Sequence, residues 1–309
     1  MKIAILGASS HIAKSLIDYL WRYDRQSALD LNLFGRTPEN INRWLAVHKI
    51  LLPIECKSFS QFENGVYDLV INMVGTSNSS EIKRLGSKIF DTALHYDDIV
   101  LGYLRVHPTC RYFFLSSGAV YGNDFAQAAQ ETTMARHQIN SGTNFDWYGV
   151  SKFCIEARHR ALVDYAIVDI RVFSYFSAWI DIAQPFLLTD AIRAIQQNSV
   201  LQTDHSDFWR DYVGIVDLAQ LLNCFMDSAP CNACVDLYSK NPMQKSEVLE
   251  LFTTDFGLRY TLNISDAGTT SLRAMYFSKN HSAARWGYSP SQDSRELVST
   301  EARKILEAF

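Results

Sequence analysis

The sequence lacks several features that would place the protein in the large classes of membrane and nucleic-acid-binding proteins. No apolar run approaches the roughly 18 residues that suggest a membrane-spanning helix, and there is no basic run and no internal repeat. The 29 Lys and Arg residues nearly balance the 33 Asp and Glu residues, so the net charge is only −4. Because no broad positive field results, we expect neither nucleic acid nor an anionic membrane as a partner.

The N-terminal stretch and the cysteine spacing predict neither a signal peptide nor a metal site. Its N-terminal apolar stretch is only a few residues long, too short for a signal peptide, so we expect a cytoplasmic protein. Of the six cysteines, only Cys231 and Cys234 have the C-x-x-C spacing, and the second pair of a structural zinc site is absent. We therefore expect ordinary thiols, with no disulfide framework and no metal site.

The composition and the hydrophobic pattern indicate a large α/β protein. Hydrophobic residues make up 48% of the 309 residues, enough for a sizeable core. In the first half of the chain, short apolar runs with little polar alternation are separated by helical segments such as 11–23, a pattern typical of a parallel sheet covered on both faces. We predict a Rossmann-type doubly wound sheet. The predicted strands are residues 2–6, 31–34, 68–74, 111–115 and 166–173.

The second half of the chain is less regular, and no Pro/Gly/Ser linker precedes it. Helices are predicted at 185–197, at 215–226, from Ser246 as an N-cap to 252, and in the amphipathic tail from 294 to 309. We predict a dinucleotide-binding lobe over 1–174, to which 208–240 returns, and a smaller C-terminal lobe, mainly substrate-binding, over 175–309. A cleft is expected at the carboxyl ends of the strands.

A short turn after the first predicted strand opens a helix. In that position backbone N–H groups and the positive helix end can hold a pyrophosphate. Gly7 would permit the sharp turn, and Ala13 is small enough for close helix–strand packing. We therefore predict that a dinucleotide contacts Gly7, Ser9, Ser10, His11 and Ile12.

Arg36 stands directly after the second predicted strand. A site for NAD usually has Asp or Glu there, which accepts hydrogen bonds from the adenosine ribose. A guanidinium instead suits a 2′-phosphate. The sequence therefore favours NADP(H) over NAD(H) as the cofactor.

Three side chains from separate segments form a candidate catalytic group. Tyr148 and Lys152 are four residues apart on a predicted helix, so they share a face. An ammonium near a phenol lowers its pKa, which would let Tyr148 exchange a proton with a hydroxyl or carbonyl, while Lys152 could also bond the nicotinamide ribose. Ser117 lies at the end of a predicted strand, where its hydroxyl can bond the same substrate oxygen.

Motifs along nearly the whole chain resemble those of the extended short-chain dehydrogenases/reductases, the NAD-dependent epimerase/dehydratase type that acts on nucleotide sugars. The Tyr/Lys pair and the Arg-Asp block are the most specific in combination. The matching segments are Gly7-x-x-Ser10-x-x-Ala13, Asp68-x-Val70-x-Asn72-x-Val74-Gly75, Ser117 to Gly122, Tyr148-x-x-x-Lys152, Ile170-Arg171-Val172-Phe173-Ser174, Arg210-Asp211-Tyr212-Val213 and Arg285-Trp286-Gly287-Tyr288-Ser289-Pro290.

The resemblance implies roles for residues that spacing alone does not assign. Val74 and Gly75 would pass the cofactor, Ser174 would face the substrate, and Arg210 would contact the diphosphate of a nucleotide sugar. The alternative for Arg210 is an ion pair with Asp207 or Asp211. The family often forms dimers through two helices of each subunit, so a homodimer is possible, although no heptad seam in the sequence establishes one.

Departures from the family pattern bear on the reaction. Ser10 replaces the second glycine of the cofactor loop, Asn72 a histidine, and Ser174 an asparagine. Gly118 and Ala119 stand where 4,6-dehydratases carry an acid and a base, so dehydration is disfavoured. The leading hypothesis is an NADP(H)-dependent keto-reductase of a nucleotide sugar. The alternatives are a nucleotide-sugar 4-epimerase and an NADP-binding regulatory or redox-sensing protein with little catalysis.

Overall fold

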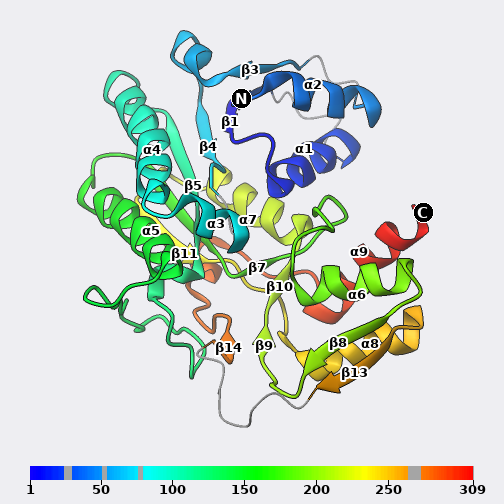
Figure 1. Ribbon diagram of the computed structural model, residues 1–309. Helices are drawn as coiled ribbons and strands as arrows, with labels where there is room; N and C mark the ends of the chain where they lie inside the picture. Colours follow the sequence, from blue (N-terminus) through cyan, green and yellow to red (C-terminus); the bar gives the residue numbers. More distant parts are fainter. Residues whose placement is uncertain (24–29, 51–53, 76–78, 264–272, 309) are drawn as a thin grey trace.

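A seven-stranded parallel sheet forms the centre of the computed structural model, which describes residues 1–23, 30–50, 54–75, 79–263 and 273–308 (Figure 1). The strand order is β11-β6-β5-β4-β1-β2-β3, and every neighbouring pair is parallel. This arrangement confirms the predicted doubly wound sheet. The strands are β1 Lys2–Leu6, β2 Asp30–Gly35, β3 Cys56–Ser58, β4 Leu69–Asn72, β5 Arg111–Ser117, β6 Ile167–Val172 and β11 Ala233–Asp236.

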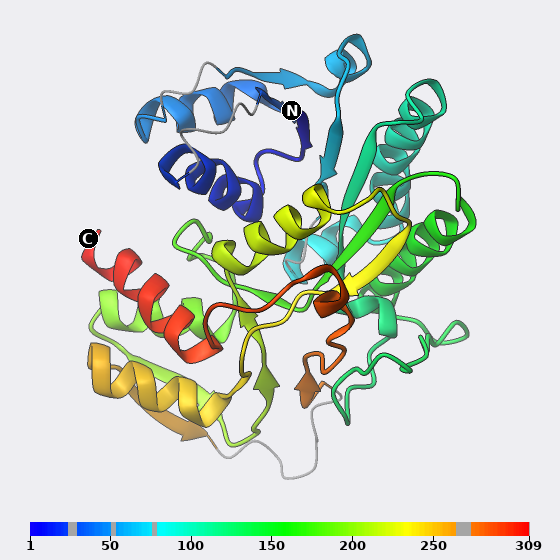
Figure 2. The ribbon, with the colours of Figure 1, turned by 180° about the vertical axis from the view of Figure 1, so that it is seen from behind.

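Helices cover both faces of this sheet (Figures 1 and 2). Helices α1 (His11–Tyr23), α2 (Pro38–Val47) and α7 (Ile215–Asp227) pack on one face. Helices α4 (Lys88–Val106) and α5 (Asn144–Ala161) pack on the other. Successive strand side chains point to opposite faces, so strands covered on both sides carry almost continuous apolar runs, as all four buried residues of β4 illustrate.

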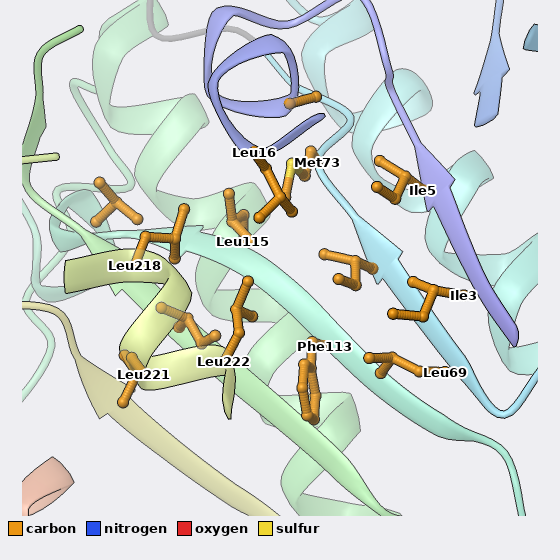
Figure 3. Close-up of a cluster of buried hydrophobic side chains, with 14 of the residues drawn as sticks. Ile3, Ile5, Leu16, Leu69, Met73, Phe113, Leu115, Leu218, Leu221 and Leu222 are labelled. Atoms are coloured by element: carbon orange, nitrogen blue, oxygen red, sulfur yellow. The ribbon is translucent and has the colours of Figure 1, made fainter. Parts of the chain in front are cut away.

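Figure 3 shows the core on the α1/α7 side of the sheet. Side chains from β1, β4 and β5 point toward apolar side chains of α1 and α7 and exclude water from this face. The labelled members are Ile3, Ile5, Leu16, Leu69, Met73, Phe113, Leu115, Leu218, Leu221 and Leu222.

A second group of elements packs beside the strand ends around its own apolar cluster (Figure 2). Its helices are α6 (Leu187–Gln196), α8 (Lys245–Phe256) and α9 (Ser294–Glu307), and β8 (Val200–Asp204) pairs with β13 (Arg259–Asn263). Short strands link it to the main sheet region: β7 (Ser174–Tyr175) with β10 (Tyr212–Val213), and β9 (Trp209–Arg210) between β12 (Met243–Gln244) and β14 (Met275–Tyr276). The remaining elements are α3 (Ser79–Leu85), η1 (Phe59–Asn64), η2 (Gly118–Tyr121) and η3 (Ser282–Trp286).

The main helices lie close to their predicted positions, with one wrong cap. Helix α8 begins at Lys245, and its N-cap is Gln244 rather than Ser246. The Gln244 N–H donates to the Glu247 carboxylate at 2.6 Å.

All six cysteines are free thiols. Among the described residues, no helix is long and apolar enough to cross a membrane. The boundaries of the two lobes stay a prediction.

Replacing Leu218 by alanine tests the packing of α7 on the sheet. Leu218 is fully buried, so we expect the free energy of unfolding in urea to fall by about 2–5 kcal/mol, from lost transfer energy and a residual cavity. Val216, 41% exposed on the same helix, is the matched control, and Val216→Ala should change it by less than about 0.5 kcal/mol. Equal effects of the two substitutions would contradict this packing.

Candidate active site

The turn between β1 and α1 is built around one glycine and one cap. Gly7 has φ +80°, and a Cβ there would lie 2.8 Å from the Met73 carbonyl carbon, so a side chain would collide with the loop after β4. Ser10 Oγ accepts a hydrogen bond from the Ala13 N–H at 3.1 Å. The residue that replaces the family glycine therefore caps the helix, which glycine cannot do with a side chain.

The donors of this turn fit the pyrophosphate of a dinucleotide. The first amides of a helix have no acceptor along the helix, and His11 and Ile12 occupy that first turn of α1. Within the described chain, His11 Nε2 is buried without a partner. Burial, and then the nearby Lys14 charge, lowers the His11 pKa to about 4, so the ring is a neutral hydrogen-bonding group. Ser9 is exposed at the turn.

Arg36 is exposed immediately beyond β2. The strand and the turn are joined, because Phe34 O accepts hydrogen bonds from the N–H groups of Gly7 and Ala8 at 3.0 and 3.1 Å. No ion pair to Arg36 is formed within the described ranges of the chain. Its guanidinium is therefore available to an anion bound beside the turn.

Lys152 is held inside the protein at the carboxyl ends of β4 and β5. Its side chain is 3% exposed, and Nζ donates to Leu115 O at 2.9 Å. Nζ also lies 4.2 Å from the ring centroid of Phe114 and would lie 3.6 Å from a Cβ on Gly75. Lys152 therefore lies against the Val74–Gly75 segment expected to pass the cofactor.

Tyr148 and Ser117 meet as predicted, but the expected pKa effect is wrong. Burial raises the pKa of Tyr148 to about 12, and a hydrogen bond with Ser117 opposes that rise. Lys152 is not among the groups that lower it; those are the Ser117 hydroxyl and the more distant charge of Arg273. In the protein alone, Tyr148 thus holds its proton and is set up as an acid.

Tyr276 and Arg273 are site residues that the sequence analysis missed. Tyr276 Oη lies 3.4 Å from Ser117 Oγ, and the Arg273 guanidinium lies 5.1 Å from the Tyr276 ring centroid and lowers the Tyr148 pKa. The pairing of β14 with β9 sets Tyr276 opposite Arg210. No motif identifies these residues, because their place depends on a two-residue strand pairing.

Arg210 is half-buried, and within the described residues it does not form the ion pair with Asp207 or Asp211 that is the alternative to a role in binding. Its Nη1 donates to the carbonyls of Trp209 and Arg273 at 2.7 and 2.9 Å, and its guanidinium lies 4.3 Å from the Phe208 ring centroid. Burial, with a smaller effect of the Arg273 charge, lowers the Arg210 pKa. Two guanidinium groups therefore flank Tyr276, an arrangement that favours an anionic ligand.

The two carboxylates nearest to Arg210 in the sequence accept hydrogen bonds from other groups. Asp211 accepts hydrogen bonds from the Ser239 N–H at 3.0 Å and from the Ser294 hydroxyl at 3.2 Å, and Asp207 accepts one from the Phe208 N–H at 2.9 Å. Neither forms an ion pair with Arg210 in the part of the chain that the structure describes.

The remaining predicted residues lie around this centre. Val74 N–H donates to Asn72 Oδ1 at 3.0 Å, which shapes the loop after β4. Ser174 is half-buried at the start of β7, paired in register with Tyr212. A Cβ on Gly118 would lie only 2.4 Å from the Phe173 ring, so this position has no room for the acidic side chain of a dehydratase. Among the residues described, no group of His, Cys, Asp and Glu side chains is arranged so that it could hold a metal ion.

Comparisons with known proteins agree with the fold. Residues 3–233 match the model of the NAD dependent epimerase/dehydratase family. No curated protein matches the sequence. Among solved structures, the chain is similar to the UDP-glucose 4-epimerase of Bifidobacterium longum in complex with NAD⁺ and UDP, with a TM-score of 0.77, 16% identity, and 100% and 98% of the two chains covered.

Two further similar structures are also epimerases. The UDP-N-acetylglucosamine 4-epimerase of Methanobrevibacter ruminantium has a TM-score of 0.77 and 13% identity, with 100% of this chain and 99% of that chain covered. The ADP-L-glycero-D-manno-heptose-6-epimerase of Helicobacter pylori has a TM-score of 0.76 and 15% identity, with 99% and 95% covered. At these identities the likeness establishes the fold alone.

The surroundings of Lys152 predict an unusual titration. Burial lowers its pKa from 10.5 to about 8, although Glu156, Asp97 and Asp169 oppose the shift. The unfolded chain keeps this proton to higher pH than the folded one, so Lys152 adds stability as pH rises from about 8 to about 10.5. We expect a lysine ε-¹³C signal, assigned by its loss in Lys152→Met, to titrate near pH 8.

Glu156→Gln removes the largest charge that favours the ammonium and should lower the Lys152 pKa further. Glu39→Gln, at an exposed glutamate of α2 on the opposite face of the sheet from α5, is the control and should leave the signal unchanged. A Lys152 signal that titrates together with the surface lysines would contradict the burial of the ammonium.

Proposed function

Because the chain belongs to the NAD-dependent epimerase/dehydratase family, we propose that it is a nicotinamide-dependent epimerase of a nucleotide-activated sugar. The observation that carries the proposal is the convergence of Tyr148, Ser117 and Tyr276 beside Arg210 and Arg273. Tyr276 contacts both parts of this site: its hydroxyl lies beside Ser117, and its ring lies beside the guanidinium groups of Arg210 and Arg273. A sugar linked to a diphosphate contains both of the groups that such a site would bind.

The chain's own residues would move the proton and hold the substrate. The bound nicotinamide would supply the hydride acceptor and donor. Tyr148 would take the proton of a sugar hydroxyl as that carbon is oxidised and return it when the carbon is reduced. Ser117 would donate a hydrogen bond to the same sugar oxygen.

Lys152 and the turn at Gly7 would orient the cofactor. The ammonium at Gly75 lies on the path expected for the nicotinamide half, where it can bond ribose hydroxyls. The first-turn amides of His11 and Ile12 would bind the pyrophosphate. A positively charged ring near Tyr148 would lower the high pKa of its phenol, which is the direction that base catalysis needs.

The comparisons favour epimerisation over the keto-reduction favoured from the sequence. The similar structures named above are all epimerases, and that of Bifidobacterium longum holds NAD⁺ and UDP. One observation keeps an NADP(H)-dependent reductase as the second candidate: Arg36 is exposed and offers a charge to a 2′-phosphate. A cofactor retained through dialysis supports the epimerase, and one that leaves supports the reductase.

Tyr148→Phe tests the proposed acid and base. The substitution removes only the hydroxyl, so we expect turnover of a responsive nucleotide sugar to fall by about 10²- to 10⁴-fold while cofactor binding is retained. Product formation on a panel of nucleotide sugars, resolved by anion-exchange chromatography, measures the rate. Tyr260→Phe, at a partly exposed tyrosine on β13, is the matched control. Wild-type turnover by Tyr148→Phe would exclude the proposed role.

Arg36→Glu tests the second candidate through the cofactor. If Arg36 binds a 2′-phosphate, the reversed charge should weaken NADPH at least about tenfold more than NADH, because a charge-assisted bond becomes a repulsion. Dissociation constants from fluorescence titration measure the difference. Arg43→Glu, at an exposed arginine of α2, is the control for a general change of charge. An equal loss for both nucleotides would remove the argument for NADP(H).

A further inference from the structure

A second polar cluster, which the proposed mechanism does not use, is buried between α4, α5 and the sheet. Its centre is His159 of α5, which is fully buried. The Nδ1 atom lies 2.6 Å from Asp169 Oδ1, and Nε2 lies 2.8 Å from Asp97 Oδ1. Ionised carboxylates only accept hydrogen bonds, so both ring nitrogens donate and the imidazole is charged.

Further charges on α5 complete this centre. The guanidinium of Arg158 lies 3.3 Å from Asp97 Oδ2, and that of Arg160 lies 2.9 Å from Asp169 Oδ2. Burial pulls the His159 pKa down, but the bonds to Asp169 and Asp97 raise it to about 9. The two buried carboxylates are therefore fixed in place by cations on the same helix.

From Asp97 of α4, hydrogen bonds continue through Tyr112 of β5 and Asn72 of β4 to the loop after β4. The Tyr112 hydroxyl donates to Asp97 Oδ1 at 3.0 Å. Its single hydrogen is then used, so it accepts from Asn72 Nδ2, also at 3.0 Å. This contact fixes the orientation of the amide and turns Asn72 Oδ1 toward the Val74 N–H. Each donor therefore faces an acceptor along the whole series of hydrogen bonds from the His159 ring to the Val74 N–H.

The chain of bonds ends where the expected cofactor-binding segments meet. A Cβ on Gly7 would lie 2.9 Å from the Val74 nitrogen, and a Cβ on Gly75 would lie 3.6 Å from Lys152 Nζ. Val74 and Gly75 therefore lie between the turn after β1 and the buried ammonium. A small shift of this loop would alter both contacts.

We propose that Asn72, Tyr112, Asp97 and His159 form a positioning network that holds the Val74–Gly75 loop in the conformation that receives the nicotinamide half of the cofactor. The proposal rests on the proposed function only in that a dinucleotide binds. None of the four residues touches the reacting atoms; each acts through the loop. Asn72 is central, because its side chain bonds both Tyr112 and the loop backbone.

Tyr112→Phe tests the network against a matched control in the same apolar cluster, Tyr103→Phe. The Tyr103 hydroxyl is also bonded on both sides, accepting from the Tyr67 N–H at 2.8 Å and donating to Gly65 O at 3.4 Å, but it is not linked to Asn72. Each substitution removes one inward-facing hydroxyl. We expect both to lower the thermal unfolding midpoint, so stability does not distinguish a positioning role from a structural one.

Two other measurements do distinguish the two roles. At a temperature well below unfolding, Tyr112→Phe should raise the dissociation constants of NADH and NADPH about three- to tenfold, and Tyr103→Phe should leave them unchanged. In the protein without nucleotide, hydrogen exchange at the Val74 amide should become at least about threefold faster in Tyr112→Phe alone. Asn72→Ala should have both effects, and adding Tyr112→Phe to it should change them little.

An unchanged Val74 exchange rate in Tyr112→Phe, or the same change in Tyr103→Phe, would overturn the network. Asn72→Ala gives the same decision if Tyr112→Phe does not fold. If the wild-type protein bound neither NADH nor NADPH, the proposed function would fail, and the exchange rates would still decide whether the network holds the loop.

Discussion

The buried ammonium group of Lys152 constrains the whole active site. It lies inside the protein at the carboxyl ends of β4 and β5. A buried charge is costly unless it is bonded and balanced. Lys152 is bonded to a strand carbonyl, and the Glu156 carboxylate of the same helix, which itself pairs with Arg171, favours the charged form of the lysine. Helix α5 must therefore lie at a fixed height against the sheet, and the same helix carries Tyr148 to the end of β5.

The elements beside the strand ends contribute to the candidate site through very little regular structure. The strands β9 and β14 contain two residues each, yet their register sets Tyr276 against Arg210. Tyr276 packs with Phe125 and Phe173 in a small aromatic cluster at the strand ends. The proposed anion site and the proposed proton-transfer site are therefore connected by packing as well as by the hydrogen bond between Tyr276 and Ser117.

The sequence patterns predicted the elements that depend on local periodicity, and they missed the residues whose positions depend on the pairing of short strands. The sheet, helix α1 and the meeting of Ser117 with Tyr148 followed from apolar runs and motif spacing, because long elements leave a strong pattern. The positions of Tyr276, in the two-residue strand β14, and of Arg273, in the turn before it, did not, because such short segments leave no pattern. The pKa of Tyr148 was predicted in the wrong direction because spacing along a helix does not report where an ammonium points or how deeply a phenol is buried.

The lack of room at Gly118 also bears on how this protein could change during evolution. The Phe173 ring fills the space that a first side-chain carbon would need. A single substitution at Gly118 could not install a new acid there without displacing this aromatic ring. A route to water elimination would also need a smaller residue at 173, and that change alone would leave a cavity beside Phe125 and Tyr276 before any new chemistry was gained.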